Sequence, residues 1–147
     1  MSKPTTADTP IYTHTTPPIR VTYRDTDRMG YVYYAQYLVW FEMGRTELLR
    51  SLGSAYKTWE DEHGVFLPVR DASIQYRQPA VYDDEVAVET RLTRITKVSV
   101  SFDYTVIRTR DNQVLATGAT SHPFVNSSGT ICRVGDKLLP QFFPAAQ

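Results

Sequence analysis

The sequence predicts a single α+β domain in which one long helix packs against an antiparallel sheet. Two observations lead to this fold class. One amphipathic segment with helical spacing follows a short strand, and most of the remaining chain shows the two-residue alternation of strands separated by short turns. Short turns join antiparallel neighbours, and the apolar stripe of a lone helix has to be buried against the sheet that those strands form.

The composition limits the class of protein. The chain has 147 residues, which is enough for one domain with a real core. Its formal net charge is zero, which argues against the basic stripe of a nucleic-acid-binding protein. No apolar run reaches the roughly 20 residues of a membrane span. Residues 1–17, rich in Thr and Pro, predict a disordered or extended tail before a domain at 18–147. Because this tail lacks the apolar stretch of a secretory signal and Cys132 is the only cysteine, we expect a cytoplasmic location.

The first half of the domain predicts a strand, a turn and the long helix. Ile19, Val21 and Tyr23 alternate with polar residues as in a half-buried strand, and a turn covers residues 25–30. From about residue 33 the spacing becomes helical, and Gly53 is a natural stop after about five turns. The predicted apolar stripe contains Tyr37, Leu38, Phe41, Leu48, Leu49 and Leu52, and is interrupted by Arg45.

The second half predicts four or five strands. Residues 65–69 are apolar but contain Pro68, which indicates an edge or a bend. Regular alternation predicts strands at about 72–76, 86–92, 98–106 and 114–125, with turns at 82–84, 110–113 and 126–129. Residues 138–143 predict a short helical turn split by Pro140. An edge strand of such a sheet can pair with a second copy of the chain, so we expect a homo-oligomer.

Asp25 and Asp27 lie in the turn before the helix, and three interpretations of this pair compete. A calcium loop starting at Asp25 needs oxygen ligands at positions that Met29 and Gln36 occupy, and a magnesium site for a nucleotide sugar lacks a glycine-rich phosphate loop, so we expect no metal. A structural interpretation is also open, because Asp and Thr side chains bond to nearby N–H groups in ordinary turns.

The third interpretation is catalytic. Residues 31–36 offer no Ser, Thr, Asp or Asn to cap the helix, so up to four backbone N–H groups there need acceptors. A developing oxyanion is one such acceptor, and Asp27 is close enough in sequence to supply a nucleophile or to activate water. Water can fill the same role if this end of the helix is exposed.

A wider pattern resembles a known family. Residues 23–37, YRDTDRMGYVYYAQY, and residues 41–50, FEMGRTELLR, resemble the hotdog-fold acyl-CoA thioesterases of the 4-hydroxybenzoyl-CoA thioesterase type. The resemblance covers about residues 18–134 and includes the stretches at 67–70, 74–80 and 82–84. It implies an antiparallel sheet wrapped around one long central helix. It also implies protomers that pair to share two active sites, as a homodimer or a homotetramer.

The resemblance implies hydrolysis of an acyl-CoA to a free acid and CoA, with no cofactor. The essential carboxylate falls on Asp27, and the backbone N–H that polarises the thioester carbonyl falls on Tyr34. Tyr23 matches a tyrosine found before the acids in one subgroup. That subgroup often has His in place of Tyr34; the backbone role survives this difference and a side-chain role does not, so the substrate range stays open.

The residues expected to contact CoA or the substrate are Lys97, Arg94 and Met29. Basic side chains suit the phosphates of CoA, although Lys97 and Arg94 are equally compatible with ordinary solvated charges in a turn. The neutral overall charge leaves open an acyl-carrier-protein thioesterase. A non-catalytic acyl-binding or scaffold dimer is another alternative, which the acid at Asp27 disfavours. A hotdog hydratase is disfavoured because no His lies in residues 15–62.

Overall fold

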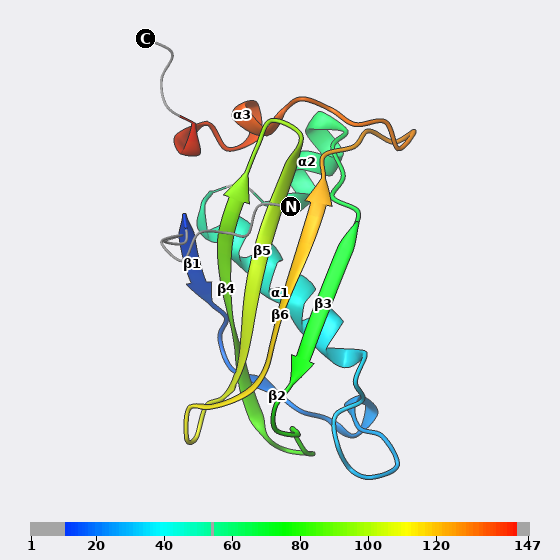
Figure 1. Cartoon of the computed structure of the whole chain (residues 1–147), viewed down its shortest axis with the longest axis vertical. Helices are drawn as coiled ribbons and strands as arrows, with labels where there is room; N and C mark the ends of the chain where they lie inside the picture. Colours follow the sequence, from blue (N-terminus) through cyan, green and yellow to red (C-terminus); the bar gives the residue numbers. More distant parts are fainter. Residues whose placement is uncertain (1–10, 54, 144–147) are drawn as a thin grey trace.

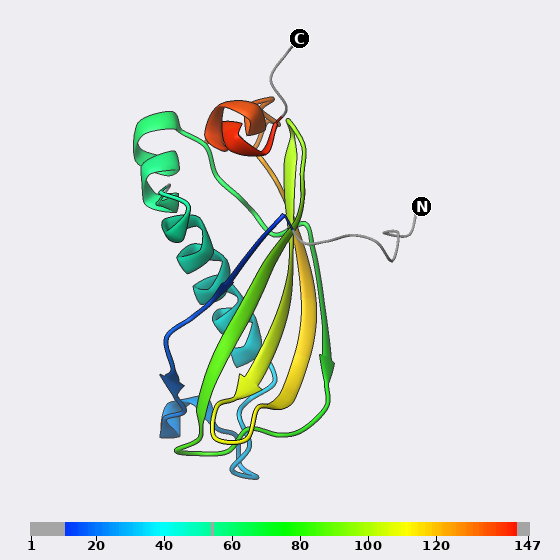
Figure 2. The same cartoon turned by 90° about the vertical axis from the view of Figure 1, so that its left-hand side faces the viewer.

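The computed structural model describes residues 11–53 and 55–143, and in it one long helix lies on one face of a curved antiparallel sheet (Figure 1). Figure 2 shows the two layers edge-on, with helix α1 on one side and the sheet on the other. The strand order is β1-β4-β5-β6-β3, and β2 also pairs with β4. The predicted α+β class, with a sheet wrapped around a long helix, is confirmed.

The sheet is built around three long strands. β4 and β5 alternate between buried and half-exposed residues, as the two-residue period predicted. Among the described residues β3 pairs only with β6, and most of its side chains are exposed. Its other edge is therefore free of pairing within residues 11–53 and 55–143. The strands are β1 (Tyr12–Thr15), β2 (Ile19–Arg20), β3 (Asp71–Tyr76), β4 (Glu85–Ile95), β5 (Ser99–Arg108) and β6 (Gln113–Pro123).

The N-terminal region differs from the sequence analysis in two places. β1 lies within the segment expected to be a disordered or extended tail. Its four residues are extended and pair with β4, so the folded part begins before residue 18. Residues 1–10 lie outside the described part of the chain. The strand predicted through Tyr23 ends earlier, because the chain turns into a 3₁₀ helix at Tyr23–Asp25. The Asp25 carboxylate accepts the Thr22 N–H there at 2.9 Å.

Two helical segments follow the long helix. α2 (Tyr56–His63) was not predicted: it buries Trp59 alone, too little to produce a visible apolar period, and it ends at Gly64, whose φ is 63°. The short helical turn near the C-terminus is confirmed as α3 (Gly135–Leu138), followed by a 3₁₀ turn at Pro140–Phe142. The predicted bend at 65–69 is confirmed too, since Phe66 makes only an isolated bridge, to Val125.

Helix α1 (Gln36–Ser51) begins three residues later than predicted and stops as predicted before Gly53, whose φ is 84°. Its N-cap, Ala35, makes no side-chain capping bond, which confirms the uncapped start. The face against the sheet is rotated slightly from the predicted stripe: Leu38 is 43% exposed, whereas Trp40 is buried. The buried residues are Tyr37, Trp40, Phe41, Gly44, Leu48 and Leu49.

Gly44 sets how closely α1 approaches β4. A Cβ at this position would collide with the hydroxyl of Thr90 and with Val88. Gly44→Ala gains up to about 1 kcal/mol of helix propensity but overpacks the interface at a cost of about 1–3 kcal/mol, so we expect a lower free energy of unfolding in urea denaturation. Val39→Ala, on the exposed side of α1, is the matched control and should not be destabilised. An unchanged denaturation midpoint for Gly44→Ala would contradict the close approach.

Candidate active site

Asp27 holds the loop that leads into α1. Its N–H donates to the Tyr31 carbonyl at 2.7 Å, and the Gly30 N–H donates to the Asp27 carbonyl at 3.0 Å. The side-chain Oδ1 accepts N–H groups from Met29 at 2.8 Å and from Tyr31 at 3.2 Å. Gly30, with a φ of 80°, allows the chain to reverse. The carboxylate therefore has the structural role in its own turn that the second interpretation of the pair required.

The same carboxylate also faces a cavity. The loop bonds use Oδ1, and Oδ2 has no hydrogen-bond partner among the residues that the structure describes. Asp27 lines a cavity of about 380 Å³ together with Tyr31, Tyr34, Tyr37, Tyr76 and Arg77, among others. One oxygen can hold the loop while the other meets a bound molecule, so the structural and catalytic interpretations do not exclude each other.

The backbone before α1 provides an unpaired donor at this cavity. Tyr34 lies two residues before the first residue of the helix and lines the cavity with Asp27. The Tyr33 carbonyl accepts the Gln36 N–H at 2.9 Å, and the Tyr34 carbonyl accepts the Tyr76 hydroxyl at 2.8 Å. Within the described part of the chain, the Tyr34 N–H itself has no acceptor. The structure thus brings Asp27 and Tyr34 together, as the sequence analysis expected.

Tyrosine side chains form much of the cavity wall. Tyr37 is buried, and its ring meets that of Tyr76 edge-on, with centroids 5.2 Å apart. Burial is the main factor that raises the pKa of both phenols, and the neighbouring Tyr34 raises that of Tyr76 further. Both phenols therefore stay protonated at neutral pH and can donate hydrogen bonds. Tyr37, which the sequence analysis treated as a packing residue, both packs and lines the cavity.

The other predicted site residues lie outside this cavity. Tyr23 is 74% exposed and stacks on Tyr82, with ring centroids 4.0 Å apart. Met29 contributes its backbone N–H to the Asp27 loop, while its side chain is 74% exposed. Arg94 lies near the end of β4, on the order of 30 Å along the strand from Glu85, and Lys97 lies in the turn that follows. One chain alone does not bring these two cations to Asp27.

Two residues of the cavity, Tyr76 and Arg77, were missed by the sequence analysis. They follow one another at the end of β3, where the alternation predicts a strand but not what the strand end meets. Arg77 donates to the Gln75 side-chain oxygen at 3.3 Å and pairs with no carboxylate among the described residues. The cavity thus contains a cation as well as the Asp27 carboxylate.

His122 belongs to a separate buried cluster. Its ring nitrogens lie 2.7 Å from the Thr120 hydroxyl and 3.3 Å from the Leu67 carbonyl, and the Tyr104 hydroxyl lies 2.6 Å from the Thr120 hydroxyl. Burial, then the charge of Arg45, lowers the pKa of His122 to about 4. Arg45, the charged residue on the apolar stripe, thus faces this cluster. Since His122 has no carboxylate partner among the described residues, it does not match the His–acid pair of a hydratase.

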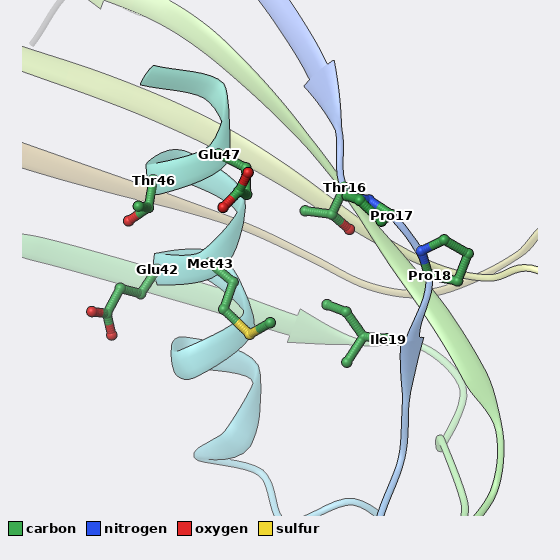
Figure 3. Close-up of a pocket in the computed structure, with 8 residues that line it drawn as sticks. All are labelled: Thr16, Pro17, Pro18, Ile19, Glu42, Met43, Thr46 and Glu47. Carbon is green, nitrogen blue, oxygen red and sulfur yellow. The ribbon is translucent and has the colours of Figure 1, made fainter. Parts of the chain in front are cut away.

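A larger cavity of about 510 Å³ lies between the β1–β2 connection and the outer side of α1 (Figure 3). Pro18, Ile19 and Met43 give it an apolar wall, and Glu42 and Glu47 add carboxylates. The middle of a helix has no unpaired backbone N–H to stabilise an oxyanion, since each is bonded within the helix. Of the two cavities, the one that contains Asp27 is therefore suited to attack on a carbonyl.

Neither a metal site nor a membrane-spanning helix has a candidate in the described part of the chain. The residues that the structure describes contain no group of three His, Cys, Asp or Glu side chains placed to hold a metal ion. No helix in the described ranges, 11–53 and 55–143, is both long and apolar enough to cross a membrane.

Comparison with known proteins supports the family assignment. Residues 21–142 match the family model described as the thioesterase-like superfamily, and the chain belongs to this superfamily, as its resemblance to hotdog thioesterases predicted. A solved structure, the DHNA-CoA thioesterase from Staphylococcus aureus, superposes with a TM-score of 0.80 at 25% identity, over 88% of this chain and 85% of that one. The predicted hotdog fold is thereby confirmed.

Two relatives resemble the chain in sequence. A putative acyl-CoA thioesterase, YneP, from Bacillus subtilis is 47% identical over 72 residues, which cover 49% of this chain and 51% of the relative. The acyl-CoA thioesterase YbgC from Haemophilus influenzae is 37% identical over 91 residues, or 62% of this chain and 67% of the relative. The chain thus spans about half the length of the first and about two thirds of the second.

Proposed function

We propose that this protein is an acyl-CoA thioesterase that hydrolyses a thioester to a free acid and CoA. The observation that carries the proposal is that one cavity holds both a carboxylate oxygen, Asp27 Oδ2, and a backbone donor, the Tyr34 N–H, neither of which has a hydrogen-bond partner among the described residues. Membership of the thioesterase-like superfamily and the names of the similar proteins support the same activity.

The thioester itself explains why so few groups suffice. A thiol has a pKa near about 8.5, so CoA leaves as a thiolate without an obligatory general acid. The site has to polarise the carbonyl and supply a nucleophile. The Tyr34 N–H at the positive end of α1 polarises the carbonyl, a contribution of roughly 3–4 kcal/mol for one such donor.

Asp27 supplies the second requirement by one of two routes. As a nucleophile, its carboxylate attacks the carbonyl carbon, the C–S bond breaks, and water then hydrolyses the mixed anhydride. As a general base, it takes a proton from a water molecule that attacks the same carbon. Both routes end in a carboxylic acid and the thiol of CoA, and neither uses a cofactor.

A second copy of the chain completes this proposal. The free edge of β3 has unpaired backbone groups, and it ends at Tyr76 in the cavity wall. Antiparallel pairing of two such edges joins the sheets into one and places each cavity beside the partner. We therefore infer a homodimer, or a homotetramer made of two such dimers. Arg94 and Lys97 can contribute to CoA binding only across such an interface.

The experiment that tests the function is a panel of acyl-CoA substrates with short aliphatic, long aliphatic and aromatic acyl groups, followed by detection of the free thiol. Hydrolysis of at least one CoA thioester is expected. The same acyl groups on acyl carrier protein form the second arm, and preference for that arm would replace CoA by the carrier protein. A protein that hydrolyses no thioester would overturn the proposal in favour of a non-catalytic acyl-binding dimer.

Arg77 should bind an oxygen-rich part of the substrate, because it is a cation in the cavity without a carboxylate partner among the described residues. We expect Arg77→Met to raise KM for an acyl-CoA by about tenfold with little change in kcat, since such a contact exists equally in the ground and transition states. Arg94→Met and Lys97→Met test the alternative that CoA is held by these two cations across the interface. If these two raise KM and Arg77→Met does not, CoA is held across the interface and the role of Arg77 is wrong.

A further inference from the structure

The hydroxyl of Tyr76 makes a contact that the proposed chemistry does not itself require. It donates a hydrogen bond to the Tyr34 carbonyl at 2.8 Å, between residues 42 positions apart in the chain. Tyr76 is the last residue of β3, and Tyr34 lies in the turn before α1. This bond therefore ties the end of the sheet to the start of the long helix, at the cavity that contains Asp27.

The Tyr76 hydroxyl comes from a well-held position. Its backbone stands opposite Ala116 of β6, and the next N–H, that of Arg77, donates to the Leu115 carbonyl at 2.8 Å. Its ring packs edge-on against the buried Tyr37. A donor fixed from the strand side and from the ring side can hold a backbone group that would otherwise move.

The peptide units on both sides of the Tyr34 Cα are held by hydrogen bonds to their carbonyl groups. In a trans peptide unit the C=O and the N–H point in opposite directions, so fixing one aims the other. The unit before Cα is fixed where the Tyr33 carbonyl accepts the Gln36 N–H, and the unit after it is fixed where Tyr34 accepts the Tyr76 hydroxyl. The N–H groups of these units, at Tyr34 and Ala35, have no acceptors among the described residues.

We propose that Tyr76 is a positioning residue for thioester hydrolysis. Its hydroxyl fixes the peptide unit after Tyr34, and together with the Gln36 N–H on the Tyr33 carbonyl this holds the Tyr34 backbone on both sides, so that the Tyr34 N–H stays aimed at the thioester oxygen. This inference rests on the proposed function. Backbone donors stabilise an oxyanion because they are already oriented when the charge develops. The turn before an uncapped helix is prone to fray, and Tyr76 supplies from the sheet the restraint that no capping side chain supplies.

Tyr76→Phe tests this role, because it keeps the ring against Tyr37 and removes only the hydroxyl. We expect kcat to fall by roughly five- to tenfold, with KM within about twofold of the wild type and the melting temperature nearly unchanged. Amide hydrogen exchange at Gln36, whose N–H is bonded to the Tyr33 carbonyl in the same turn, should become faster. Tyr12→Phe in β1 is the matched control: it removes a phenol hydroxyl with no hydrogen bond to another described residue, and its kinetics should equal those of the wild type.

The outcomes separate this inference from the proposed function. If Tyr76→Phe keeps the wild-type kcat while Asp27→Asn does not, the positioning role is wrong and the thioesterase proposal stands. A rise in KM without a change in kcat would mean that the hydroxyl contacts bound substrate, and this too overturns positioning. A loss of kcat with unchanged exchange at Gln36 has the same consequence. A wild type that hydrolyses no thioester overturns both proposals.

Discussion

Asp27→Asn is expected to lower kcat by at least about a hundredfold while the fold and the melting temperature stay those of the wild type. The substitution removes the negative charge that attacks the carbonyl or takes the proton from water. It leaves an oxygen that can accept the same N–H groups, from Met29 at 2.8 Å and from Tyr31 at 3.2 Å. Turnover is measured by thiol release on the best substrate of the panel, and the fold by circular dichroism and thermal melting.

Asp25→Asn is the matched control for this prediction. The Asp25 carboxylate accepts the N–H and the hydroxyl of Thr22 at 2.9 and 3.0 Å, and it does not line the cavity. We expect a small loss of stability, because a neutral amide is a weaker acceptor, and a kcat within about threefold of the wild type. If Asp25→Asn loses turnover and Asp27→Asn retains it, the two acids have been assigned the wrong way round. Full turnover in both variants would remove this acidic pair from the mechanism.

The part of the site that could be predicted from sequence is the part that is local in sequence. Asp27 and Tyr34 are only seven positions apart, in the segment that leads into the helix. The sequence itself shows that this segment has no capping side chain. Tyr76 and Arg77 reach the same cavity from the end of β3, and their place depends on the register of β3 against β6. No local pattern specifies that register relative to the start of α1, so these residues required the structure.

The fold shows the same division between local and long-range information. The alternation along β4 and β5 was readable because each strand buries one face over its whole length. β1 was missed because its four residues are held mainly by backbone pairing with β4, which leaves little trace in a Thr- and Pro-rich sequence. The buried face of α1 was misjudged at Leu38 because the sheet meets the helix along Trp40 and Gly44, and a glycine carries no hydrophobic signal.

The second large effect is expected at the backbone of Tyr34. Tyr34→Pro removes the N–H that polarises the thioester carbonyl, and we expect kcat to fall by roughly a hundred- to a thousandfold. Loss of this N–H deletes no backbone hydrogen bond between described residues, because it has no acceptor there. Proline is also tolerated at helix starts, where N–H groups lack intrahelical partners. Retention of the wild-type melting temperature shows that the turn still forms.

Tyr34→Ala distinguishes the backbone from the side chain at this position. Tyr34 is 63% exposed, and the substitution removes its phenol. It keeps the backbone N–H and the carbonyl that accepts the Tyr76 hydroxyl. We therefore expect a kcat within about tenfold of the wild type and far above that of Tyr34→Pro. Equal losses in the two variants would assign the role to the tyrosine side chain. In that case the oxyanion donor would have to be sought elsewhere, and the helix start would no longer explain how Asp27 and the thioester are brought to react.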